Sequence, residues 1–206
     1  MSELMRIYHD PPNTKAINKV ISLFKNGGIV IFPSDTVYAM GCVASNKKAV
    51  ERMRTIHRGK IANTPMSFIC RDLSQVSTLT KQLDQPVFKI LKRAFPGPYT
   101  FILPGGSHLP SSFKKRKEVG VRIPNNEIVR SILDGLGEPI ATRSIKDENL
   151  MLEYITDPEL VYEHWQHQVD LVIDGGISGN IASTVIDLTV YPPEVIREGL
   201  GSIDFI

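Results

Sequence analysis

The stretch 29-IVIFPSDTVYAMGC-42 combines the two signals on which the expected fold and site depend. Its apolar run Ile29–Phe32 is typical of a strand, and the polar residues Ser34, Asp35 and Thr36 follow directly. Open α/β sheets bind their ligands at the carboxyl ends of strands, so these polar groups are candidate ligand contacts. An alternative is a turn in which Asp35 and Thr36 satisfy local backbone donors.

Helical and strand-like segments alternate on both sides of this stretch. Apolar residues at helical spacing after a possible cap at Thr14 predict a helix that ends before Gly27. Further helices are expected over 47–56, 87–94, 128–136 and from Asp157 onward. Further strands are expected over 66–70, 99–103, 119–123, 169–173, 184–188 and 194–197, and a short apolar segment lies at 139–141. About seven strands mixed with about five helices indicate an α/β fold with a partly parallel sheet.

The composition is that of an ordinary globular protein, with 42% hydrophobic and 22% charged residues among 206. We expect one domain over residues 1–206. The net charge of +2 is too small to imply nucleic-acid binding by itself. Cys42 and Cys70 form no CxxC pattern, which favours a reducing cytoplasm. The charged N-terminus and the lack of 18 consecutive apolar residues argue against secretion and against a membrane span.

Motifs of common nucleotide and metal sites are absent from the sequence. There is no GxxxxGK[ST] phosphate loop, and the single G-x-G, at Gly199, has no helix after it. HExxH is also absent. His164 and His167 are three residues apart, a spacing more often found in solvated histidines than in metal ligands, so we expect no metal site.

Two segments place cations where an anion could reach them. In Arg58-Gly59-Lys60 the charges flank a glycine, which allows close approach of a phosphate. The alternative is a pair of solvated cations at a helix C-terminus. Arg122 lies inside the apolar strand 119–123, where burial would be costly unless the guanidinium met a carboxylate or an anionic ligand. The alternative is an edge strand with Arg122 on its wet face.

Other polar groups follow two later strands. Thr142 and Ser144 come at the end of the short segment that begins at Ile140, and Arg197 closes the last predicted strand. If these groups converge on one cleft, they would suit a triphosphate and its transition-state charge.

Six motifs together carry a family resemblance. PSDTVYAMGC, Arg58-Gly59-Lys60, PGPYTFIL, VGVRIP, STVIDL and REGLG resemble, in this order, successive motifs of the YrdC/YciO-like family of threonylcarbamoyl-AMP synthases. The resemblance implies a single twisted mixed α/β sheet flanked by helices, with a large basic cavity. It also implies an ATP-dependent reaction that joins L-threonine and bicarbonate into threonylcarbamoyl-AMP, with Mg²⁺ accompanying ATP and pyrophosphate released. The product serves tRNA modification, and members are also described as binding double-stranded RNA.

The resemblance also implies roles for individual residues. It assigns Thr36, Arg122 and Thr142 to L-threonine. The residues that it assigns to the nucleotide and its phosphates are Arg58, Lys60, Ser144, Lys146 and Arg197.

The chain departs from the family pattern at several of these positions. Arg58 and Lys60 reverse the usual Lys-x-Arg order. Ile61, Ile69 and Lys146 stand where the family usually has proline, histidine and asparagine. These changes point to the YciO-like branch, whose members share the fold but whose synthase activity is doubtful or weak. Ile69 cannot donate a hydrogen bond to a substrate.

The sequence therefore supports hypotheses from two classes of function, an enzyme and a binding protein. The first is an ATP-dependent synthase. The second is a nucleotide- or double-stranded-RNA-binding protein that kept the cavity and lost the chemistry, with RNA phosphates contacted by Lys114, Lys115, Arg116 and Lys117 together with Arg54, Arg58 and Lys60. A solvated loop is the alternative for the four-cation run. A related carbamoylation of a different amino acid or acceptor is a third possibility.

Overall fold

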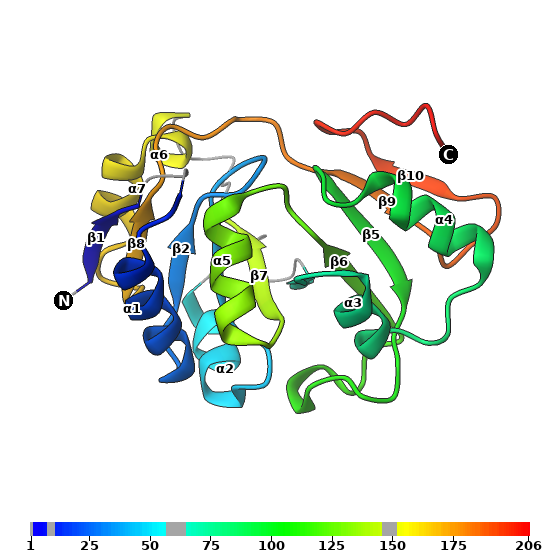
Figure 1. Ribbon diagram of the computed structural model, residues 1–206, viewed down its shortest axis with the longest axis horizontal. Coiled ribbons are helices and arrows are strands. Elements are labelled where there is room, and N and C mark those ends of the chain that lie inside the picture. The colour runs from blue at the N-terminus through cyan, green and yellow to red at the C-terminus, as the bar shows by residue number, and fades with distance from the viewer. Residues whose placement is uncertain (1, 8–10, 57–64, 146–151) are drawn as a thin grey trace.

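The computed structural model describes residues 2–7, 11–56, 65–145 and 152–206, which form one mixed sheet flanked by helices (Figure 1). The strands are β1 (Glu3–Arg6), β2 (Val30–Phe32), β3 (Ala39–Val43), β4 (Ser67–Ile69), β5 (Tyr99–Pro104), β6 (Glu118–Arg122), β7 (Ile140–Ser144), β8 (Leu171–Asp174), β9 (Thr184–Asp187) and β10 (Glu194–Arg197). The helices are α1 (Thr14–Lys25), α2 (Lys47–Ile56), α3 (Leu73–Leu79), α4 (Gln85–Ala94), α5 (Glu127–Leu136), α6 (Glu153–Thr156) and α7 (Pro158–Trp165), with a short 3₁₀ turn η2 (Ser111–Phe113).

The strand order is β1-β8-β2-β3-β7-β4-β6-β5-β9-β10. Strand β8 pairs in parallel with both β1 and β2, and β4·β6 and β5·β9 are the other parallel pairs. The remaining neighbours run antiparallel. The predicted α/β fold with a partly parallel sheet is therefore confirmed.

Each face of the sheet carries its own apolar cluster. One cluster packs α2, α3, α4 and α7 against strand residues that include Phe68 and Val121. The other packs α1 and α5 against residues that include Val30 and Phe32, and it extends along the sheet as far as Ile69 on β4. In Figure 1, α1 and α5 lie in the half of the molecule that contains β2 and β7, and α3 and α4 lie in the half that contains β5 and β6.

Helix α5 illustrates how local sequence sets an element that borders the site. The Asn126 side chain caps it by accepting a hydrogen bond from the Val129 amide at 3.1 Å. Five apolar residues at helical spacing are buried on one face. Gly137 ends the helix in the left-handed conformation, φ 73°, which glycine adopts without steric cost. The helix predicted over 128–136 is therefore confirmed, with its first residue at Glu127.

Several elements differ from the sequence prediction. The cap of α1 is Asn13 and not Thr14, because the Asn13 side chain accepts from the Lys15 and Ala16 amides. Strands β1 and β3 and helices α3 and α6 were not predicted. All five residues of β3 are buried, so its sequence shows no alternation of polar and apolar residues.

Cys42 and Cys70 are both buried and unpaired. Burial raises the pKa of the Cys42 thiol to about 12 and also raises the pKa of Cys70. Within the described ranges, no helix has the length and apolar character needed to cross a membrane.

Candidate functional site

The turn between β2 and β3 holds Thr36 in a fixed orientation. The Ser34 hydroxyl donates to the Val37 carbonyl at 2.7 Å and accepts from the Thr36 amide at 3.2 Å. Thr36 is only 2% exposed, and its hydroxyl lies 3.1 Å from that of Ser34. The chain turns here as in the alternative interpretation, but the side chain that accepts from a local backbone amide is Ser34, and not Asp35 or Thr36. The Asp35 carboxylate has its partner outside this turn.

That partner is Arg122, which is 8% exposed. Its Nη2 donates to Asp35 Oδ1 at 3.0 Å and to Thr36 Oγ1 at 3.1 Å, and Asp35 Oδ2 accepts from the Asn125 amide at 3.0 Å. Strand β6 lies between β4 and β5, so the edge-strand alternative for Arg122 is wrong. Its buried Nε has no hydrogen-bond partner among the described residues. Sequence reasoning anticipated a carboxylate or an anion here, and the structure supplies a carboxylate.

Strand register places Arg197 on the same face of the sheet as Arg122. Val121 is paired with Phe101, so Arg122 lies beside Thr100, which in turn faces Val185, and Val185 is paired with Arg197. Burial is the main cause that lowers the pKa of Arg122, and the nearby charge of Arg197 lowers it further while Asp35 opposes this. The guanidinium groups of Arg122 and Arg197 thus place two positive charges on the same face of the sheet.

Arg197 is itself held by the chain segment that precedes β9. Its Nη2 donates to the Ser183 carbonyl at 2.8 Å, and its Nε donates to the same oxygen at 3.2 Å. The Ser183 hydroxyl lies 2.8 Å from the buried hydroxyl of Thr100. Sequence reasoning did not single out Ser183 or Thr100, although both lie within motifs of the family resemblance.

Thr142 and Ser144 extend this polar face across β7. Thr142 is paired with Gly41 and with Ser67, and its hydroxyl donates to the Met40 carbonyl at 2.9 Å. The oxygen of that hydroxyl can still accept a hydrogen bond. Ser144 is exposed and is paired with Ala39, directly after the turn that carries Thr36. The structure therefore brings Thr36, Arg122, Thr142, Ser144 and Arg197 to one face.

The strap, defined as residues 175–183, crosses this region between β8 and β9 (Figure 1). It passes close to the turn, because a Cβ atom placed on Gly179 would lie 2.8 Å from the Thr36 carbonyl oxygen. A side chain at this position would force the strap and the turn apart.

Three predicted nucleotide contacts, Arg58, Lys60 and Lys146, lie outside the described residues, as does the departure at Ile61. Ile69, which stands where the family usually has histidine, is fully buried on β4 and is paired with Arg122. An apolar, water-excluded group thus borders the guanidinium of the site.

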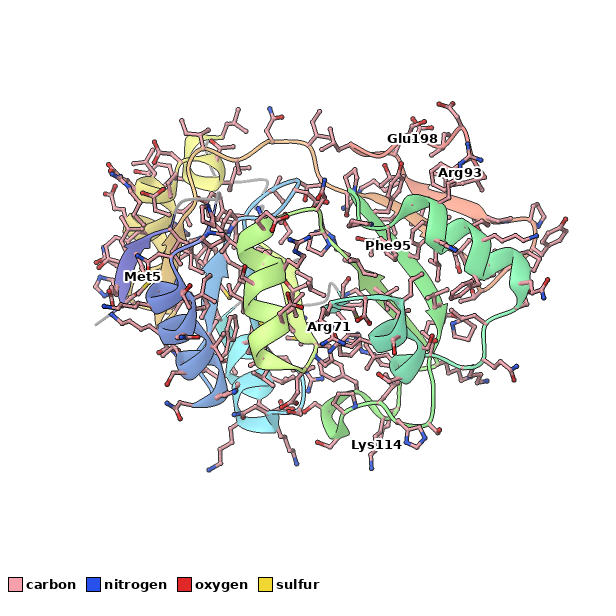
Figure 2. All side chains as sticks on the ribbon, in the orientation of Figure 1. Met5, Arg71, Arg93, Phe95, Lys114 and Glu198 are labelled. Atoms are coloured by element: carbon pink, nitrogen blue, oxygen red, sulfur yellow. The ribbon has the colours of Figure 1, made fainter. Side chains whose placement is uncertain are left out.

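The basic run 114–117 divides into two kinds of residue. Lys114, Lys115 and Lys117 are exposed. Arg116 is half-buried, donates to the Met66 carbonyl at 2.6 Å and has its guanidinium carbon 4.9 Å from the centre of the Phe113 ring. The run lies in the connection from β5 to β6, directly before the first residue of β6, whereas Arg122 is the last residue of β6. Figure 2 shows Lys114 at the lower edge of the molecule.

Arg54 lies next to Arg116, as the RNA-binding hypothesis requires. Its guanidinium carbon is 5.7 Å from the same ring, and it donates to the Ser112 carbonyl at 2.9 Å. Its other close contact is Glu51, at 2.6 Å. Arg54 and Arg116 are thus both engaged in holding the loop.

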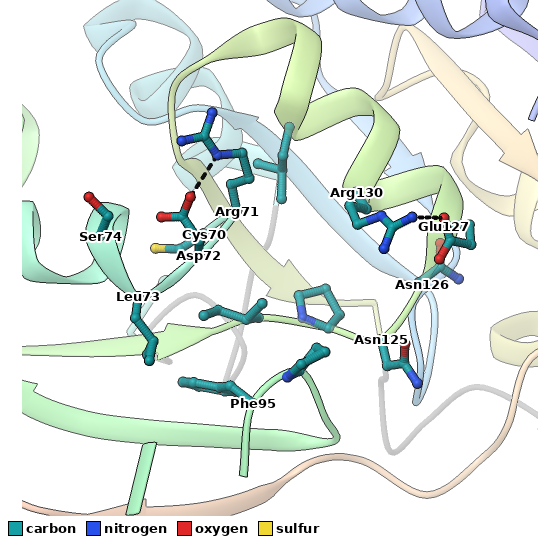
Figure 3. Close-up of a pocket in the computed structure, with 14 residues that line it drawn as sticks. Cys70, Arg71, Asp72, Leu73, Ser74, Phe95, Asn125, Asn126, Glu127 and Arg130 are labelled. Carbon is teal, nitrogen blue, oxygen red and sulfur yellow. Dashed lines mark hydrogen bonds and ion pairs between the residues drawn. The ribbon is translucent and has the colours of Figure 1, made fainter. Parts of the chain in front are cut away.

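A separate cavity of about 440 Å³ opens between the N-terminal ends of α3 and α5 (Figure 3). Its floor includes Phe95 and Ile123, and ion pairs between Arg71 and Asp72 and between Arg130 and Glu127 lie on its rim. Sequence reasoning did not predict this cavity, because its walls come from separate segments. Asn125, which lines it, also contacts Asp35.

Among the described residues, no group of three or more His, Cys, Asp or Glu side chains could hold a metal ion. Asp35, the carboxylate nearest to the candidate site residues, is already engaged by Arg122 and the Asn125 amide.

Known proteins of two kinds resemble this chain. The Sua5/YciO/YrdC family model, whose description is telomere recombination, matches residues 22–199. The uncharacterized protein YciO of Escherichia coli K12 is 38% identical over 98% of both chains. A threonylcarbamoyl-AMP synthase of Pyrococcus abyssi is 31% identical over 85% of this chain and 51% of its own length.

Solved structures of YciO and of Sua5 also resemble this chain. The crystal structure of Escherichia coli YciO has a TM-score of 0.90 at 36% identity and covers 99% of this chain and 98% of its own. Pyrococcus abyssi Sua5 complexed with L-threonine has a TM-score of 0.85 at 28% identity, covering 96% of this chain and 58% of its own.

Proposed function

The chain belongs to the Sua5/YciO/YrdC family, and we propose that it is an L-threonylcarbamoyladenylate synthase-like enzyme, which joins L-threonine, bicarbonate and ATP. Its likeness to a threonylcarbamoyl-AMP synthase and to threonine-bound Sua5, both of Pyrococcus abyssi, supports this proposal. The product would serve threonylcarbamoylation of tRNA in the cytoplasm.

The observation that carries the proposal is the buried contact of Arg122 with Asp35 and Thr36. Only Nη2 makes these two contacts, and a guanidinium has further N–H donors on its other nitrogens. Asp35 orients the group and offsets the cost of burying its charge, while Thr36 adds a hydroxyl beside it. This arrangement suits the carboxylate and hydroxyl of threonine, with Thr142 as a further acceptor on the same face.

The nucleotide would lie toward Arg197 and Ser144. Arg197 places a second cation on the face that carries Arg122, which favours the negative charge of a triphosphate. We assign Arg58, Lys60 and Lys146 to the phosphates as well, on the family motif alone. Mg²⁺ would enter with ATP as part of the substrate, because the described residues offer no carboxylate cluster to hold it.

In the proposed reaction the amine of L-threonine bonds to the carbon of bicarbonate with loss of water. A carboxylate oxygen of the resulting N-carboxythreonine then attacks the α-phosphate of ATP, and pyrophosphate leaves. The residues of this chain would position the two reactants and neutralise phosphate charge, which is the main catalytic requirement of phosphoryl and nucleotidyl transfer. Thr36, Arg122 and Thr142 would orient the amino acid, and Arg197 would stabilise charge that develops on the phosphates.

A nucleotide-binding protein without synthase activity is the second candidate. Ile69 favours it, because this fully buried side chain lies beside Arg122 and cannot donate a hydrogen bond to a substrate. Double-stranded RNA could bind the exposed lysines of the basic run, although Arg116 is engaged by the fold.

One assay separates the two candidates. The purified protein is incubated with ATP, Mg²⁺ and bicarbonate, and pyrophosphate release is measured with L-threonine, with D-threonine and without amino acid. The proposed synthase releases pyrophosphate only with L-threonine. ATP binding by calorimetry without such release would support the second candidate and overturn the first.

A further inference from the structure

The hydroxyl of Tyr38 makes two hydrogen bonds to the first residues of the strap. It donates to the Gly176 carbonyl at 2.8 Å and accepts from the Gly175 amide at 3.1 Å. Tyr38 is fully buried and follows Thr36 by only two residues. The same turn therefore carries the predicted threonine contact and the side chain that holds the strap.

Backbone hydrogen bonds fix the first part of the strap after β8. Asp174, which is 5% exposed, accepts from the Gly176 amide at 2.9 Å, and Gly176 has a left-handed φ of 88°. Further along, the Ser178 amide donates to the Thr156 carbonyl at 3.0 Å. Ile177 and Ile181 are 79% and 51% exposed, so apolar packing contributes little to the position of this segment.

The far end of the strap reaches the other half of the site. Ser183 accepts from Arg197 and contacts Thr100, while Gly179 lies against the Thr36 carbonyl. The strap thus runs from the Tyr38 hydroxyl, past Thr36, to the guanidinium of Arg197. The hydrogen bonds to Tyr38 at one end of the strap and to Arg197 at the other therefore determine how it lies against Thr36.

We propose that Tyr38 is a positioning residue whose two hydrogen bonds hold the strap against the turn of Thr36, so that the strap retains the small substrate on Arg122. The retention of threonine rests on the proposed function, whereas the placement of the strap does not. Burial raises the pKa of Tyr38, so its hydroxyl stays protonated and can donate throughout the neutral range.

Tyr38→Phe removes both hydrogen bonds and keeps the ring in the core. Tyr99→Phe is the matched control, because the Tyr99 hydroxyl also donates to a backbone carbonyl, that of Ser202 at 3.0 Å, which is not part of the strap. We expect hydrogen exchange of amides 175–179 to become about tenfold faster or more in Tyr38→Phe, a factor typical of one or two lost hydrogen bonds. Tyr99→Phe leaves these amides unchanged.

Unchanged exchange in the strap of Tyr38→Phe would overturn the inference. So would an equal acceleration in β5 and β6, because it would show general destabilisation. Gly179→Ala offers a second route, since the added methyl group pushes the strap from Thr36 without changing Tyr38. We expect both variants to raise the KM for L-threonine at least about fivefold with little change in the KM for ATP. If the unaltered protein binds no threonine, the proposed function fails, and the exchange experiment still decides what Tyr38 does.

Discussion

Arg116 and Arg122 lie near opposite ends of β6 and use their charge differently. Arg122 meets a buried carboxylate and a hydroxyl, and it shares its face of the sheet with a second guanidinium. Arg116 meets a carbonyl oxygen and an aromatic ring, beside Arg54. The first arrangement orients a charge and leaves donors for an anionic ligand. The second holds a loop, which shows that a cation in a basic run need not be available to a partner.

The largest expected effect separates the role of Arg122 in binding from its role in folding. Arg122→Ala leaves Asp35 buried without its counter-ion, which should lower the free energy of unfolding by about 3 to 5 kcal/mol. Arg122→Met combined with Asp35→Asn removes both charges and should recover much of that loss. We expect both variants to bind L-threonine at least about 100-fold more weakly.

Urea denaturation and calorimetric titration measure these two quantities separately. Arg130→Ala is the matched control, because Arg130 forms an exposed ion pair with Glu127 on α5. Threonine binding that survives in the double variant would show that Arg122 serves the fold alone.

Arg116→Ala should affect stability and not ligands. It removes the hydrogen bond to Met66 and the contact with the Phe113 ring, at a cost of about 1 to 2 kcal/mol in the free energy of unfolding. Lys115→Ala, a neighbour in the same run, should leave that free energy unchanged. If Arg116→Ala weakened ATP or threonine binding at equal stability, the two ends of β6 would not be independent.

We expect only three of the four cations in the basic run to contact RNA phosphates, because Arg116 is engaged by Met66 and Phe113. Neutralising Lys114, Lys115 and Lys117 together should lower the slope of log affinity against log salt by up to about 3, since each phosphate contact contributes about 0.9. Arg116 should add nothing to that change. Electrophoretic mobility shifts with an RNA duplex at several salt concentrations measure the slope. No change in slope would leave these lysines as a solvated loop.

The last expected effect concerns the two buried thiols, Cys42 and Cys70. Cys70 donates its amide to the Arg122 carbonyl at 2.8 Å, and the charge of Arg54 partly offsets the burial that raises the pKa of Cys42. Because burial raises both pKa values, the stability that they contribute is complete below the pKa of an unfolded thiol, about 8.5. It is lost as the pH rises toward the folded pKa of Cys42, about 12.

Unfolding by urea at pH 8 and at pH 10.5 tests this sign, with Cys42→Ala and Cys70→Ala as controls that should reduce the difference. Alkylation of the folded protein at pH 8 should be slow for both thiols. Rapid alkylation of Cys42 in the native state would contradict its burial.

The sequence predicted much of the fold and only part of the site. Periodicity located α5 and β6, because their burial follows from residues close together in the chain. Strand β1 pairs with β8 from the far end of the sequence, and no local pattern in Glu3–Arg6 reveals that. The burial of Arg122 could be inferred from its apolar neighbours. Its partner Asp35 and the reach of Tyr38 to the strap depend on strand order, which local patterns do not determine.

The position of β8 between β1 and β2 has a consequence for folding during synthesis. Both strands emerge from the ribosome early, yet the hydrogen bonds of Leu171–Asp174 that join them become available only after most of the chain has been made. Contacts so distant in sequence are slow to form, and unpaired strand edges are prone to association with other chains. The part of the sheet formed by β1, β8 and β2 is therefore among the last to be completed, although two of its three strands are translated first.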